Sequence, residues 1–183
     1  MNFLFFGRIT KYKGLNILWE AYKRLLDKYK QQITLSIVGE GDLKLNVNEI
    51  KKTIGTNVVN EWIPNEDLYK YFGRKNVVLV CPYIDATQSG VIMLGYDFLV
   101  PVIATKTGGI PEQVQDNVTG LLIEPNSIDE LYKAMEKFIL NIDILSKYSF
   151  NIKSYMSNFS WIKSIGKFEK YIDLEGTKGG ECL

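Results

Sequence analysis

Glycine and basic residues recur at the points where the predicted strands of this sequence end. They are Gly7 and Arg8, Lys13 and Gly14, Gly39 and Gly41, the run from Asp85 to Gly90, and Gly108 and Gly109. Glycine lets a backbone approach a ligand closely, and the N-terminus of a helix presents free N–H groups to an anion. Arg8 and Lys13 add two cations. Gathered at one edge of a sheet, these groups would bind a diphosphate.

Each of these residues has a simpler interpretation when it is taken alone. A single glycine is commonly a turn residue, and Arg8 and Lys13 are of the type that is usually solvated at the surface. Asp85 is a candidate helix cap or turn residue, and Gln88 and Ser89 are candidate N-terminal capping residues. The sequence holds neither a full dinucleotide fingerprint nor a phosphate loop. The joint position of all these residues favours the binding site, because ligands of parallel sheets bind beyond the carboxyl ends of the strands.

The elements that must position these residues alternate along the chain. Apolar runs predict strands at 2–6, 33–38, 58–63, 77–81, 101–105 and 120–123. Helical spacing predicts helices at 15–26, 43–53, 65–72, 91–99 and 128–140, the last capped by Ser127, with further helix from about 142. This alternation predicts an α/β fold, a Rossmann-like parallel sheet with helices on both faces. We expect one domain over residues 1–174 and a loose tail at 175–183.

The composition excludes several kinds of chemistry. The 183 residues include no histidine, which excludes Ser-His-Asp and Cys-His nucleophile systems and histidine metal sites within the chain. The formal net charge of +1 gives no support to a nucleic-acid partner held by bulk charge. The two cysteines, Cys81 and Cys182, do not make a disulfide framework, and Cys81 lies in an apolar run typical of a core. We therefore expect a reducing, cytoplasmic setting.

Six segments of the sequence, in order, resemble one family. The chain is similar to the C-terminal, nucleotide-sugar-binding domain of retaining glycosyltransferases with the GT-B fold, in the glycosyl transferases group 1 family. The resemblance covers roughly residues 3–140, and it is carried by 5–14 (FFGRITKYKG), 35–41 (LSIVGEG), 60–64 (NEWIP), 80–83 (VCPY), 101–112 (PVIATKTGGIPE) and 120–125 (GLLIEP). Each segment is a weak signal, but the ordered set is specific.

The resemblance implies a role for each matching residue. Arg8 and Lys13 match the family's arginine and lysine that hold the donor diphosphate and balance the charge of the leaving group, a role that replaces a metal ion. Asp85 would orient the transferred sugar. The donor-binding positions implied by the same match are Gly7, Gly39, Ile63, Asn65, Gln88, Ser89, Gly90 and Val91, of which Ile63 and Asn65 would meet the nucleobase. No metal or other cofactor is expected.

Two positions depart from the family pattern. The family commonly carries two glutamates eight positions apart, one near the transferred sugar and one on the ribose hydroxyls. Here those positions hold Ala86 and Leu94. Asp85, one residue earlier, is a candidate substitute for the first, whereas the Leu94 side chain cannot accept a hydrogen bond from ribose.

A GT-B enzyme has two such domains, and its reaction takes place in the cleft between them. The resemblance therefore implies an N-terminal acceptor domain of about 150–200 residues that this sequence lacks. We expect a fragment or a half-gene, with the aromatic residues at 159–171 partly exposed. The expected partner is a nucleotide-sugar donor, with no nucleic acid, and a peripheral membrane association through the missing half is left open.

Two other classes of function stay open at this point. One is a non-catalytic half-domain that docks onto a separate partner protein, which the loss of the two glutamates favours. The other is a flavodoxin-like or epimerase-like nucleotide binder of the same sheet class. Sugar epimerases of the GT-B fold use histidine and acidic residues that this sequence does not match.

Overall fold

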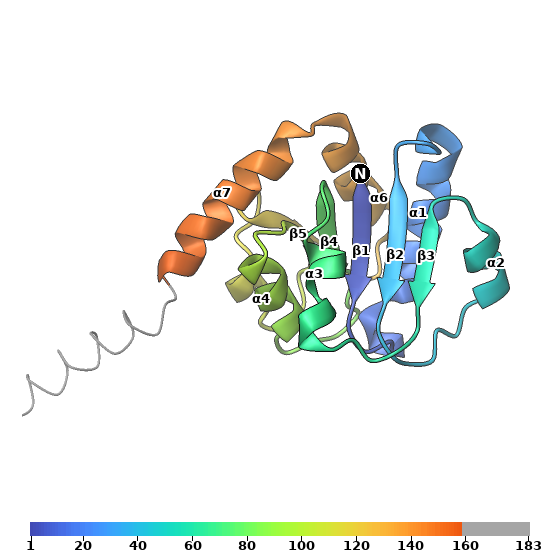
Figure 1. The fold of residues 1–183 in the computed structure, drawn as a ribbon. Helices are drawn as coiled ribbons and strands as arrows, with labels where there is room; N and C mark the ends of the chain where they lie inside the picture. The colour runs from blue at the N-terminus through green and yellow to red at the C-terminus, as the bar shows by residue number, and fades with distance from the viewer. Residues whose placement is uncertain (159–183) are drawn as a thin grey trace, which may run out of the picture.

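The computed structural model describes residues 1–158, and they form a single parallel sheet with helices on both faces (Figure 1). The predicted fold class is therefore confirmed. The six strands lie in the order β3-β2-β1-β4-β5-β6, and every adjacent pair is parallel. Their bounds are β1 (Asn2–Phe6), β2 (Thr34–Val38), β3 (Thr56–Val59), β4 (Val77–Cys81), β5 (Val102–Thr105) and β6 (Gly120–Ile123).

The helices connect these strands and cover the sheet. They are α1 (Leu15–Tyr29), α2 (Val47–Lys52), α3 (Tyr69–Phe72), α4 (Gly90–Asp97), α5 (Ile110–Gln113), α6 (Ile128–Leu140) and α7 (Asp143–Asn158). Two single turns of 3₁₀ helix, η1 (Lys11–Lys13) and η2 (Asn65–Asp67), lie in the connections. In Figure 1, α7 begins near the start of β1 and runs along the side of α4, with which it is in contact.

The core has two halves because successive side chains of a strand point to opposite faces. Phe3 and Phe5 of β1 pack with the residues of α1 and α6 on one face. Leu4, between them, packs with α4 and α7 on the other face. Strand β4 is buried along its whole length, as expected for a central parallel strand, and Cys81 at its end is a buried free thiol.

Three element predictions need correction. The strand expected at 58–63 is β3, which ends at Val59, because the side chain of Asn60 exchanges two 3.0 Å hydrogen bonds with the backbone of Gly41. The helix expected at 43–53 begins only at Val47, where the Asn46 side chain accepts a hydrogen bond from the Glu49 N–H. Helix α5 is a single turn that the sequence analysis did not predict.

The cap predicted for α6 is confirmed. The Ser127 hydroxyl accepts a 3.2 Å hydrogen bond from the N–H of Glu130 in the first turn of the helix. Helix α7 begins at Asp143, close to the predicted start at about 142. The aromatic residues at 159–171 and the tail at 175–183 lie outside the described residues.

Candidate functional site

The carboxyl ends of β1 and β2 are held close together by glycine. The Gly7 N–H donates to the Val38 carbonyl at 3.0 Å, and the Ile9 N–H donates to the Glu40 carbonyl at 2.8 Å. Gly39 has a φ of +134°, and a Cβ there would collide with the carbonyl of Gly7. A side chain at position 39 would therefore push the two loops apart.

A first hollow of about 270 Å³, which we call the Arg8 hollow, opens where these two strands end. It is lined by Phe6, Gly7, Arg8, Gly39, Glu40, Glu61, Trp62 and Ile63. Three of the predicted donor-binding residues, and Arg8 itself, are in this list. The Arg8 side chain is exposed, and it makes no ion pair with a carboxylate among residues 1–158.

A second hollow of about 290 Å³, which we call the Lys13 hollow, opens beyond the end of β4. It is lined by Tyr12, Lys13, Tyr83, Asp85, Ala86, Thr87 and Gln88. The structure thus brings Lys13, Asp85 and Gln88 together at one place. Ala86, at the position of the usual glutamate, lines the same hollow, and Asp85 beside it is exposed.

Lys13 is an unusual lysine because its side chain is only 8% exposed. Its ammonium donates a 2.9 Å hydrogen bond to the hydroxyl of Tyr83 and lies 4.2 Å from the centre of the Tyr83 ring. No carboxylate within residues 1–158 forms an ion pair with it. Burial lowers the pKa of Lys13, because the charged form loses water, and the electrostatic interaction with Cys81 opposes this shift only in part.

Two backbone features hold Lys13 in this position. The Ile84 N–H donates to the Tyr12 carbonyl at 2.7 Å, which ties the loop after β1 to the loop after β4. Gly14 has a φ of +68°, and a Cβ there would collide with the carbonyl of Pro82. Only glycine lets α1 begin this close to the end of β4.

The N-terminus of α4 directly follows Gln88, the last residue that lines the Lys13 hollow, whereas Ser89, Gly90 and Val91 line neither hollow. Ser89 is the N-cap residue, but its side chain makes no capping hydrogen bond with its own helix. Its hydroxyl instead lies 3.2 Å from the Tyr83 hydroxyl. The simple capping role left open for Ser89 is therefore wrong, and the first turn of α4 keeps N–H groups that its N-cap side chain does not satisfy.

The loop after β5 supports this N-terminus from behind. The Gln113 side chain accepts a hydrogen bond from the Ser89 N–H at 2.8 Å and donates one to the Ser89 carbonyl at 3.2 Å. The Gly109 N–H donates to the Thr87 carbonyl at 2.6 Å, and a Cβ at Gly108 would collide with the carbonyl of Ala86. Gly108 and Gly109 thus pack against the loop that carries Asp85 and Gln88.

The two hollows are linked through Gly7 and Val91. A Cβ on Gly7 would lie 3.1 Å from a methyl carbon of Val91, so the first turn of α4 packs directly on the loop after β1. Leu94, at the position of the usual ribose ligand, packs against the hydrophobic core instead. Asn65 starts η2, is exposed and lines neither hollow.

Tyr83 and Gln113 were not among the predicted site residues. Both lie in or beside segments that carry the resemblance, but nothing in their spacing indicates that their side chains would meet at Ser89. The available signal was a polar residue close to the end of a five-residue apolar strand, since only Pro82 separates Tyr83 from Cys81. The described residues contain no group of three or more metal-ligating side chains, and no helix in that part of the chain is long and apolar enough to cross a membrane.

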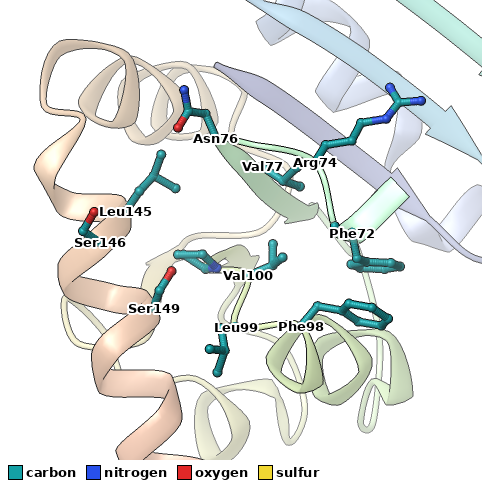
Figure 2. A pocket seen from close by; sticks show the side chains of 12 residues that line it. Phe72, Arg74, Asn76, Val77, Phe98, Leu99, Val100, Leu145, Ser146 and Ser149 are labelled. Carbon is teal, nitrogen blue, oxygen red and sulfur yellow. The ribbon is translucent and has the colours of Figure 1, made fainter. Parts of the chain in front are cut away.

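A third hollow, of about 340 Å³, lies at the opposite edge of the sheet, between α7 and the loops that precede β4 and β5 (Figure 2). The rings of Phe72 and Phe98 stack there with their centres 5.3 Å apart. Figure 2 shows Arg74 pointing away from the hollow, and its Nε donates to the Lys70 carbonyl at 2.7 Å. None of the predicted site residues lines it.

Comparison with known proteins decides the family. The family model described as "Glycosyl transferases group 1" matches residues 2–154. This chain belongs to that family. The O-antigen chain mannosyltransferase C of Escherichia coli is 32% identical to this chain over 153 residues, which are 81% of the chain and 40% of the relative.

Solved structures agree with the fold. The C-terminal domain of a glycosyl transferase group 1 family protein from Francisella tularensis has a TM-score of 0.74 at 22% identity, and the match covers 86% of this chain and 84% of that domain. The Anabaena protein HepE, solved in complex with UDP and glucose, has a TM-score of 0.76 at 18% identity over 94% of this chain and 48% of its own. The chain spans less than half of the length of the curated relatives it matches.

Proposed function

We propose that this chain is the donor-binding half of a retaining glycosyltransferase, and that the whole enzyme transfers a hexose-type sugar from a nucleoside diphosphate sugar to a saccharide or lipid acceptor. The observation that supports this best is the buried ammonium of Lys13, which has no carboxylate partner within residues 1–158 and lies beside the N-terminus of α4. A buried charge without a counter-ion is costly, so a site of this kind is built to receive an anion.

The proposed roles follow from the geometry of the two hollows. The diphosphate lies against the first turn of α4, where Gly90 and Val91 offer backbone N–H groups and Lys13 offers its ammonium, whereas the Ser89 N–H is already bonded to Gln113. Arg8 meets the same diphosphate from the loop after β1. These two cations stabilise the charge that develops on the departing diphosphate, which is the task that a metal ion performs in other transferases.

The nucleoside and the sugar occupy the two ends of this arrangement. The nucleobase lies in the Arg8 hollow, where Gly7 and Gly39 leave the backbone open and Ile63 offers backbone groups. The transferred sugar lies in the Lys13 hollow, where Asp85 orients its hydroxyl groups and Gln88 lies beside it. The complex of HepE with UDP and glucose is a precedent in a protein of the same fold. Nucleoside diphosphate sugars and the free thiol of Cys81 both fit a cytoplasmic setting.

The acceptor belongs to the half of the relatives that this chain does not span. We therefore expect the isolated chain to bind a nucleotide and to catalyse little, because the acceptor is not held in line with the donor. A thermal-shift and calorimetry panel with UDP, GDP, ADP and their sugars tests the proposal. Saturable binding of one base series supports it, and no binding by any of them would overturn it.

Leu94 favours a second candidate function. Because this partly buried side chain packs against the core where the family usually places a ribose ligand, a non-catalytic half-domain that docks onto a separate partner is the alternative. That function predicts no response to the nucleotide panel and a stable complex with a protein that resembles the N-terminal half. Nucleotide binding by the isolated chain would decide against it.

A further inference from the structure

The side chains of Lys13 and Ser89 meet at the Tyr83 hydroxyl, and the Gln113 side chain bonds to the backbone of Ser89. Lys13 comes from η1, Tyr83 follows β4, Ser89 precedes α4, and Gln113 ends α5. Lys13, Tyr83 and Ser89 are 8%, 2% and 4% exposed, so this polar chain lies inside the protein. Polar groups that are buried together are expensive to misplace, which makes such a chain rigid when every member has a partner.

One direction in this set of hydrogen bonds is fixed by chemistry. An ammonium only donates, so the Tyr83 oxygen accepts from Lys13. Either hydroxyl is able to donate in the bond between Tyr83 and Ser89, because the Tyr83 hydroxyl also bonds to the side chain of Cys81. This pairing turns the Ser89 side chain away from the capping position of α4.

The Ser89 backbone is held separately. Gln113 bonds to both its N–H and its carbonyl, at 2.8 and 3.2 Å, in the way that a neighbouring strand would. The Tyr83 backbone is held as well, because the Thr105 hydroxyl donates to its carbonyl at 2.6 Å. The backbone of Tyr83 is thus fixed to β5, and the backbone of Ser89 is fixed to α5.

We propose that Tyr83 and Gln113 are positioning residues of the donor site. Gln113 sets the Ser89 backbone, and the Tyr83 hydroxyl joins the Lys13 ammonium to Ser89, so that the ammonium and the N-terminus of α4 act on the same diphosphate. This inference rests on the proposed function, because it concerns how the proposed diphosphate contacts are held in place. Gln113 lines neither hollow, and Tyr83, which lines the Lys13 hollow, acts in this proposal through its hydroxyl on Lys13 and Ser89.

The two residues predict different effects. Gln113→Met removes both hydrogen bonds at nearly constant length, so the first turn of α4 loses its orientation and the affinity for a nucleoside diphosphate falls by roughly tenfold. Affinity for the matching nucleoside monophosphate falls less, because it makes fewer contacts with the helix. Tyr83→Phe removes the acceptor of Lys13, which leaves the buried ammonium harder to keep charged. Cys81 and Tyr12 also face the Lys13 ammonium, and both are kept in this variant. The pH above which nucleotide binding is lost therefore moves to a lower value in Tyr83→Phe.

The experiment uses isothermal titration calorimetry with UDP, UMP, GDP and GMP, on the full chain, from pH 7 to pH 10. Gln115→Met is the matched control, because Gln115 is exposed and its side chain lines neither hollow. If the wild type binds none of the nucleotides, the proposed function itself fails. If the wild type binds and both folded variants keep its diphosphate affinity and its pH profile, only the positioning roles are overturned. Should Gln113→Met not fold, the pH profile of Tyr83→Phe decides.

Discussion

The two edges of the sheet carry hollows of similar size and opposite character. At the carboxyl edge, the Arg8 and Lys13 hollows combine glycines, two cations without carboxylate partners in the described residues, and a helix N-terminus that is not capped by its own side chain. At the amino edge, the larger hollow of Figure 2 is lined by stacked phenylalanines and serines, and Arg74 turns away from it. Size therefore does not distinguish a site here, whereas the buried ammonium of Lys13 and a helix N-terminus without a side-chain cap do.

Burial is what sets Lys13 apart from the other cations. On the face where α1 and α6 meet, Arg24 bonds to Asp129 and Lys28 bonds to Glu136, and Lys106 pairs with Glu124 beyond the end of β5. Exposed pairs of this kind contribute little to stability, and other exposed cations of residues 1–158, Arg74 among them, form no ion pair. Lys13, in contrast, is buried, and it has no carboxylate partner among residues 1–158.

The largest expected effect comes from Lys13→Met, which keeps the length of the side chain and removes its charge. We expect the affinity for a nucleoside diphosphate to fall by about 100-fold, because the ammonium of Lys13 is buried and is therefore less screened by water than the exposed Arg8. We also expect the ligand-free protein to gain about 1 kcal/mol in the free energy of unfolding, because an unpaired buried charge is removed. Calorimetry and urea denaturation measure the two quantities. A loss of both affinity and stability would indicate a structural lysine instead.

An intermediate effect is expected from a pair of arginine variants, one at each edge. Arg8→Ala lowers diphosphate affinity by about tenfold and reduces its dependence on salt, because one exposed charge contact to the phosphates is lost. Arg74→Ala removes an equally exposed arginine at the amino edge and leaves the affinity unchanged. Calorimetry at 50 and 300 mM NaCl would compare them, and equal losses from the two variants would contradict the assignment of the site to the carboxyl edge.

The edge of the sheet that carries the candidate site could be predicted from the sequence, because it depends only on the order of strands and loops along the chain. Strands with apolar runs, such as Val77–Cys81, end at fixed points, and the parallel topology then places every following loop at one edge. The order of the matched segments also indicates the family from the sequence alone. The sites of Arg8 and Lys13 stay predictions, but the edge on which both lie follows from the topology.

The parts that could not be predicted depend on side chains that meet across the fold. The burial of Lys13 is one example, because a lysine followed by glycine in a polar loop is usually solvated. The turn of Ser89 away from its helix is another, because it depends on Tyr83, which lies on a different element. Strand β3 ended early for the same reason, since Asn60 replaces backbone pairing by a side-chain contact with Gly41.

The smallest expected effect is a change of stability with pH in the ligand-free protein. Burial lowers the pKa of Lys13 below its ordinary value of 10.5, so between the folded and unfolded pKa values the unfolded chain binds more protons than the folded one. Stability attributable to Lys13 therefore rises as pH increases through its folded pKa, and the rise ends near 10.5.

Two buried tyrosines change the stability in the opposite direction. Burial raises the pKa of Tyr22 to about 12 and raises that of Tyr83 further. The unfolded chain therefore loses these protons at a lower pH than the folded protein, and stability falls as pH rises. Comparing the wild type with Lys13→Met removes the contribution of Tyr22, since both proteins contain it. We expect the stability advantage of Lys13→Met, measured by urea denaturation, to be constant near neutral pH and to shrink by a few tenths of a kcal/mol or more toward pH 10. An advantage that does not change with pH would show that the ammonium of Lys13 is as well solvated in the folded protein as in the unfolded chain, and the contrast between the two edges would lose its electrostatic basis.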